Sequence, residues 1–135
     1  MVICAEKVIE TFDERELKYS VDEREDGGAV VVVPFRNFRI NLIFEAGDEG
    51  SHVALRVVLE SCPPDRVGAL LVICNSLNAK YRWLKFYIDD DRDIMVEDDA
   101  ILEPETAGEE CCELISRTVS ILEDVRPVIM NGIFG

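Results

Sequence analysis

The chain has 135 residues, with 28 Asp and Glu against 14 Lys and Arg, and its formal net charge is −14. This length suits a single domain, residues 1–135, and the 48% hydrophobic content is too high for a disordered acidic chain. A surface this negative is repelled by phosphate groups, so we exclude nucleic acid and membrane surfaces as partners.

The first half of the chain predicts an amphipathic helix followed by a meander of strands. Apolar residues fall at helical spacing between Val2 and Phe12. Runs typical of strands then follow at residues 17–21, 29–33, 38–44 and 53–59. The run Ala29–Val33 is apolar at every position, which predicts a strand that is covered on both faces or lies centrally. Because the loops at 26–28 and 47–50 are short, we expect successive strands to be antiparallel neighbours.

The second half predicts a helix, two strands and a final helix. Pro64 opens the first of these helices, and alternation then predicts strands at residues 84–88 and 94–96. Pro104 opens a long helix that Pro127 ends or kinks. The tail after Pro127 is apolar and is expected to pack against the protein. This pattern predicts an α+β fold, an antiparallel sheet with helices packed on one face.

The helix that follows Pro64 is apolar over more than one face, because Val72 and Ile73 lie off its inward stripe. Such a helix usually packs against two elements, and the second is either another subunit or the edge of the sheet. We predict a homodimer. Its interface is expected to contain two residues of this helix and three of the tail: Val72, Ile73, Ile129, Ile133 and Phe134.

Motifs for catalysis or for cofactor binding are not found in the sequence, so we expect neither catalytic residues nor a cofactor. The segment Asp89–Glu105 contains nine acids and one base, and acids at every second position from Asp89 to Asp93 imitate the start of an EF-hand loop. The sixth and twelfth positions of that loop must be Gly and Glu, whereas here they are Ile94 and Ala100. We therefore expect an acidic, solvated hairpin tip and no metal site.

The five cysteines are an odd number and form no CxxC pair, so we expect reduced thiols in a cytoplasmic protein. Cys111 and Cys112 are adjacent on the last predicted helix and point about 100° apart, so they cannot readily share a zinc ion. No basic residue lies close to them in the sequence to lower a thiol pKa. Residues 1–14 lack the pattern of a signal peptide, and no apolar run reaches the ~20 residues that span a bilayer.

Aromatic and basic residues form a candidate protein-binding surface. Trp83, Lys85 and Tyr87 share one face of a predicted strand, and Arg39 and Arg56 lie on neighbouring predicted strands. Trp, Tyr and Arg supply most of the binding energy at protein interfaces. We predict that these five residues bind another protein; the alternative is that this face lies under a helix.

The order of elements and several short motifs resemble a known family. The motifs are Tyr19-Ser-Val, the strand Gly28–Phe35, the helix end Asn75-Ser-Leu-Asn78 and the strand Lys85-Phe86-Tyr-Ile88. They resemble the YbjN-like family, described as putative bacterial sensory transduction regulators, which is similar in fold to the type III secretion chaperones. The resemblance implies the order α-β-β-β-α-β-β-α and a non-enzymatic regulatory or adaptor protein that binds another protein. The alternative that it implies is a secretion-type chaperone that holds an extended client segment.

Overall fold

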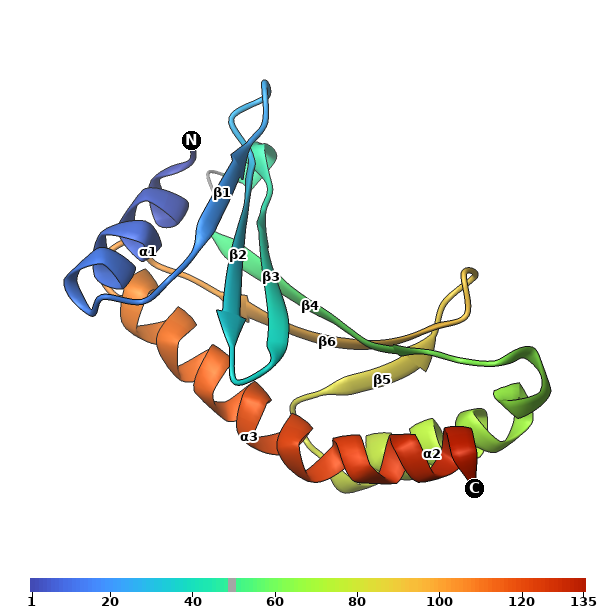
Figure 1. Cartoon of the computed structure of the whole chain (residues 1–135). Coiled ribbons are helices and arrows are strands. Elements are labelled where there is room, and N and C mark those ends of the chain that lie inside the picture. Colours follow the sequence, from blue (N-terminus) through green and yellow to red (C-terminus); the bar gives the residue numbers. More distant parts are fainter. Residues whose placement is uncertain (49–50) are drawn as a thin grey trace.

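The computed structural model describes residues 1–48 and 51–135, which form three helices and a six-stranded sheet (Figure 1). The predicted loop at 47–50 lies partly outside the described residues, at Glu49 and Gly50. The helices are α1 (Ile3–Glu14), α2 (Val67–Lys80) and α3 (Ala107–Phe134). The strands are β1 (Ser20–Glu23), β2 (Ala29–Phe35), β3 (Phe38–Phe44), β4 (His52–Ser61), β5 (Lys85–Ile88) and β6 (Asp93–Ile101).

The sheet has the order β1-β2-β3-β4-β6-β5, and every pair of neighbours is antiparallel. Arg36 and Asn37 make the tight β2–β3 turn with φ of +48° and +69°, the pair of positive values that a two-residue hairpin turn needs. The predicted α+β fold is confirmed. Four strands precede α2, one more than in the order that the resemblance implies.

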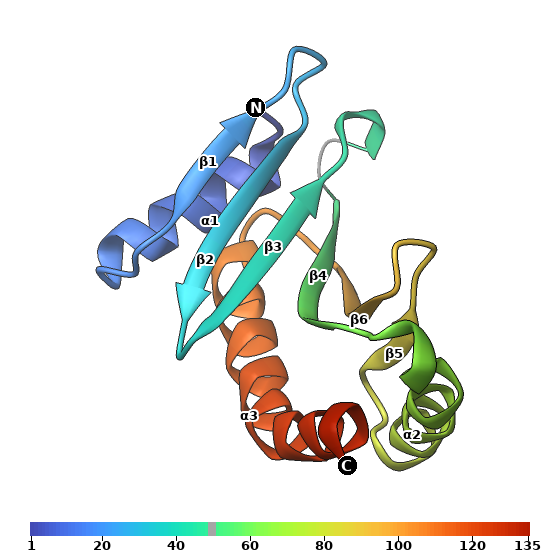
Figure 2. The same ribbon diagram turned by 45° about the vertical axis from the view of Figure 1, so that its right-hand side comes forward.

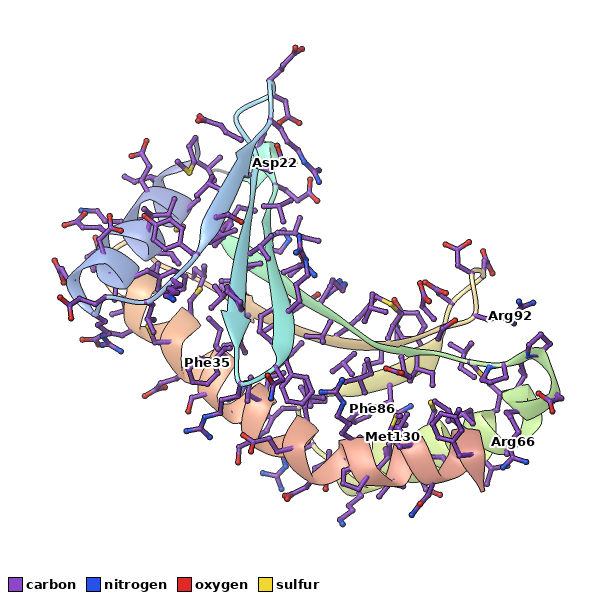
Figure 3. All side chains as sticks on the ribbon, viewed as in Figure 1. Asp22, Phe35, Arg66, Phe86, Arg92 and Met130 are labelled. Carbon is purple, nitrogen blue, oxygen red and sulfur yellow. The ribbon has the colours of Figure 1, made fainter. Side chains whose placement is uncertain are left out.

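All three helices pack on the same face of the curved sheet, as the two ribbon views show (Figures 1 and 2). The inward residues of the strands alternate with outward ones, and one continuous cluster of buried apolar residues joins the sheet to the helices. Phe12, Phe44 and Phe86 are the largest of its fully buried side chains. In Figure 3, Phe86 lies between β5 and the helices.

The run Ala29–Val33 lies in β2, inside the sheet between β1 and β3, which agrees with its predicted central position. Ala29, Val31 and Val33 are buried against the helices. Val30 and Val32 are only partly buried, because they point to the face of the sheet that carries no helix.

Pro127 kinks the last helix and does not end it. The helix α3 continues to Phe134 and changes direction along its length, so that its second half runs beside α2 (Figure 1). A proline inside a helix removes the N–H that would bond to the carbonyl four residues earlier, here that of Glu123, and its ring pushes that turn apart. The apolar tail is therefore helical and packed, with Ile129 and Ile133 buried.

None of the helices formed by the described residues has the length and apolar character that crossing a membrane requires.

Candidate protein-binding face

The open face of the sheet is the face without helices, and it is made by the outward residues of β2 to β6. On β3 these are Arg39, Asn41 and Ile43, because Phe38, Ile40 and Leu42 point to the helices. The pairing register identifies the residues of the other strands that lie on this face: Asn41 pairs with Arg56, Arg56 with Glu97, and Glu97 with Lys85. Four strands therefore place polar side chains in one row across this face.

Arg56 is the centre of this row. Its Nε lies 3.1 Å from Glu97 Oε1, and its Nη1 lies 2.6 Å from Asp99 Oδ1. The same Nη1 donates to its own strand, at the carbonyl of Leu55 (2.8 Å), and Asn41 Nδ2 donates to the Arg56 carbonyl (3.2 Å). The guanidinium is thus held in one orientation by strands β4 and β6 before any ligand arrives, and Asn41 of β3 bonds the backbone of the same residue.

Glu97 connects Arg56 on β4 to the side chains of Lys85 and Tyr87 on β5. Its carboxylate also accepts a hydrogen bond from Tyr87 Oη at 2.5 Å and lies 3.8 Å from Lys85 Nζ. That hydrogen bond, together with burial, raises the pKa of Tyr87 to about 12. The phenol is therefore protonated at neutral pH and stays a donor in this network.

The structure brings four of the five predicted binding residues onto the open face and places the fifth at its margin. Arg39, Arg56, Lys85 and Tyr87 point outward from β3, β4 and β5. Trp83 lies in the bend before β5 and is 55% exposed. That these residues bind a protein stays a prediction.

The Trp83 ring contacts two cations, its chain neighbour Arg82 and Arg117 from α3. The guanidinium carbon of Arg117, on α3, lies 4.9 Å from the centre of the indole ring, and that of Arg82 lies 6.0 Å from it. Arg117 also bonds Asp98 Oδ2 at 3.2 Å. This links the indole to the buried side of β6.

The acidic segment is not a solvated hairpin tip along its whole length, as the sequence had suggested. Only residues 89–92 form the tip of the β5–β6 hairpin, where Figure 3 labels Arg92. Asp98 points to the helices and is 5% exposed, bonded to Arg117 and to Thr118 Oγ1 (3.4 Å). Burial raises its pKa above the ordinary value. The alternation of Ile94 and Val96 is the signal in the sequence that points to a buried Asp98, and the prediction of a solvated tip did not take it into account.

The hairpin tip gathers three carboxylates. Oxygen atoms of Asp89, Asp91 and Asp93 all lie within 4.8 Å of one another. Asp89 Oδ1 accepts the backbone N–H groups of Asp91 (3.0 Å) and Asp93 (2.8 Å), so this carboxylate has a structural role in closing the turn. The expected lack of a metal site stays a prediction.

The pKa values of the adjacent cysteines Cys111 and Cys112 make them poor nucleophiles. Burial raises the pKa of Cys111 to about 12 and also raises that of its neighbour Cys112, although Arg15 beside Cys112 opposes the second shift. A thiol needs a lowered pKa to act as a nucleophile near neutral pH. A role of Cys111 and Cys112 in packing therefore agrees better with these pKa values than a role as reactive thiols.

The residues predicted for a dimer interface divide into two groups. Ile129 and Ile133 are 1% and 8% exposed, because the second half of α3 packs against α2 within the chain. Val72 and Phe134 are 68% and 79% exposed, and Ile73 lies between these extremes. Only the exposed members are free to meet a second copy, and the dimer stays a prediction.

Comparison with known proteins gives one family. A model of the YbjN family, "putative bacterial sensory transduction regulator", matches residues 5–130, nearly the whole chain. A search of curated proteins found no match to this sequence.

Proposed function

Because the chain belongs to the YbjN family of putative bacterial sensory transduction regulators, we propose that it is a non-enzymatic regulatory or adaptor protein that binds another protein in the cytoplasm. The observation that carries this proposal is the open face. Arg39, Arg56, Lys85 and Tyr87 lie on one uncovered side of the sheet, and Arg56 is already fixed by Glu97 and Asp99. A preformed face ordered before binding loses little side-chain entropy when a partner docks.

The pKa values of the buried groups support a role without catalysis. Burial is the largest cause of the raised pKa of Asp98, and also of the cysteines Cys62, Cys74, Cys111 and Cys112. Catalytic groups are tuned by partners that converge on one crevice. A hollow of about 430 Å³ between the β2–β3 turn and α3 is lined by none of these groups. Two further hollows, of about 180 and 260 Å³, are lined by one of them each, Cys112 and Asp98, so neither hollow brings two of them together.

Reversing the charge of Arg39 tests the proposed binding face. Arg39 is exposed and, among the described residues, has no carboxylate within 4.0 Å, so Arg39→Glu leaves the fold intact. Affinity capture from the native cell at moderate salt, with quantitative mass spectrometry, should recover the partner about tenfold less with this variant.

The matched control is Arg24→Glu, which makes the same change of charge in the exposed β1–β2 turn, outside the open face. It should recover the partner as the unmodified chain does. Equal recovery with both variants would remove the open face from the proposal.

We further propose that the protein is a homodimer through α2. From Val67 to Ala79 this helix has no charged residue, although 31% of the residues of the chain are charged. Its outward face exposes Leu71 and Val72, which are 53% and 68% exposed. Two copies with a net charge of −14 each can meet here without bringing carboxylates together.

The substitution Val72→Asp should convert this dimer into a monomer, because it places two carboxylates at the centre of an apolar contact. Light scattering measures the mass directly. Val58→Asp is the control, since Val58 is similarly exposed (51%) but lies on β4 and not on α2. A mass that is unchanged by Val72→Asp would contradict the α2 interface.

A further inference from the structure

One stretch of strand β6 has no neighbouring strand on one side among the residues that the structure describes. Strand β5 pairs with Ile94–Glu97, so within residues 1–48 and 51–135 Asp98–Ile101 is bonded to β4 on one edge and to no strand on the other. Uncovered strand backbone is a template for pairing with another chain, and natural proteins usually blunt it.

The other strand edges nearby are blunted. The outer edge of β5 is closed by a side chain of α2: Asn78 Oδ1 accepts the Phe86 N–H (2.7 Å) and Asn78 Nδ2 donates to the Phe86 carbonyl (2.9 Å). Where β2 extends beyond β1, the outward position is Pro34, which has no N–H to offer. The edge of β6 has neither device.

The backbone groups at this edge point outward. The N–H of Leu102 bonds the Ser51 carbonyl beside β4, and groups alternate along an antiparallel strand, so Asp99 and Ile101 face the other way. The pairing of β5 gives the same result. The backbone of Phe86 bonds Asn78 on the outer side of β5, so Lys85 and Tyr87 are the residues of β5 that bond β6, at Glu97 and Met95. Glu97 therefore faces β5, and by alternation Asp99 and Ile101 face the same side. The N–H and C=O groups of Asp99 and Ile101 therefore point away from β4, toward the edge that β5 does not reach.

The side chains around this edge define what would bind it. Ile101 is 85% exposed and Trp83 is 55% exposed. Beside Trp83 lies a hollow of about 260 Å³, lined by Arg82, Trp83, Lys85, Glu97, Asp98 and Asp99. The edge thus combines an exposed aliphatic side chain, an exposed indole and a hollow beside the indole.

The charges of the hollow are unevenly matched. Its three acids are matched by three cations. Arg56 bonds Glu97 and Asp99, Lys85 Nζ lies 3.8 Å from Glu97, and Arg117 bonds Asp98. Among the described residues, Arg82 has no carboxylate within 4.0 Å, and its guanidinium lies over the Trp83 ring. The unsatisfied charge of the site is therefore positive, in a chain whose net charge is −14.

We propose that the edge of β6 at Asp98–Ile101 binds an extended segment of a partner protein as an added strand, with an apolar side chain against Trp83 and a carboxylate against Arg82. This inference rests on the proposed binding role and names the place and the chemistry of the partner. A second copy of the chain fits less well, since the acids at its own β6 edge are already held by Arg56 and Arg117 and leave Arg82 without a free carboxylate to bind.

A displayed library of random peptides about eight residues long, selected on the full chain, tests the proposal. Enriched peptides should carry Asp or Glu near an aliphatic residue. Synthetic copies should shift the emission of Trp83, the only tryptophan, to the blue. They should also slow the amide exchange of Asp99 and Ile101 by about tenfold, without changing that of Leu102.

Two pairs of variants locate the contact. Ile101→Pro removes the outward N–H and should weaken peptide binding about tenfold, whereas Ile101→Val keeps both the N–H and an aliphatic side chain and should bind normally. Arg82→Glu should weaken binding to the same extent, and Lys18→Glu, which is exposed and distant in the chain, should not.

Failure to enrich any peptide overturns the proposal. Binding that leaves the exchange of Asp99 and Ile101 unchanged, or protection of these amides by raising the concentration of the chain alone, overturns it as well. If Arg39→Glu loses the captured partner and Ile101→Pro retains it, the proposed binding role stands and the edge of β6 is not its site.

Discussion

Replacing Gly108 by alanine is expected to lower the free energy of unfolding by about 3 kcal/mol. Gly108 is buried near the start of α3, where this helix crosses α1. A Cβ added there would overlap both the Oγ1 and the Cβ atoms of Thr11. A change of the Thr11 rotamer moves Oγ1 but not Cβ, so the two helices have to separate.

The control is Gly68→Ala, the same change in another helix. Gly68 is exposed in the first turn of α2, and an added Cβ would meet nothing within 4 Å. Because alanine favours the helix over glycine, this variant should gain about 0.5 kcal/mol. Denaturant unfolding with an unchanged m value measures both. A loss below about 1 kcal/mol for Gly108→Ala would mean that the α1–α3 crossing adapts without cost.

Local patterns were sufficient to predict the elements but not the order of the strands. Alternating apolar residues marked the strands, and helical spacing marked α1, since each pattern reports which side of one element is buried. Strands β4 and β5 are consecutive in the chain, yet β6 lies between them. Pairing between distant segments is a property of the whole sheet, and no short window of sequence contains it.

The same difference between local pattern and strand pairing explains which parts of the candidate site could be predicted. Parity within a strand placed Lys85 and Tyr87 together, and it placed Arg39 and Arg56 on outward positions. Glu97, which joins Arg56 to Tyr87, could not be predicted because its role depends on the register of β6 between two strands. The uncovered edge of β6 depends in turn on how short β5 is, and on Asn78 closing the far side of β5.

Truncation of the chain after Pro127 is expected to destabilise the protein by about 5 kcal/mol, which is between a third and all of the stability of an ordinary domain. The last turns of α3 bury Ile129 and Ile133 and pack closely on α2: a Cβ added at Gly132 would overlap Ile73 Cδ1 and lie 3.3 Å from Leu70. Truncation also removes the Gly132 carbonyl, which accepts Arg66 Nε at 2.8 Å. Near-ultraviolet circular dichroism during thermal unfolding should show lost tertiary structure at room temperature.

Substitutions at two neighbouring positions test whether buried side chains of the tail contribute to the free energy of unfolding. Ile129→Ala should cost about 3 kcal/mol, since Ile129 is 1% exposed and its removal leaves a cavity between α3 and α2. Val128→Ala should cost less than about 1 kcal/mol, because Val128 is 44% exposed and alanine is the better helix former. If both variants cost the same small amount, the tail beyond Pro127 would hold no part of the core, and the helical continuation of α3 would have to be stabilised by contacts outside the chain.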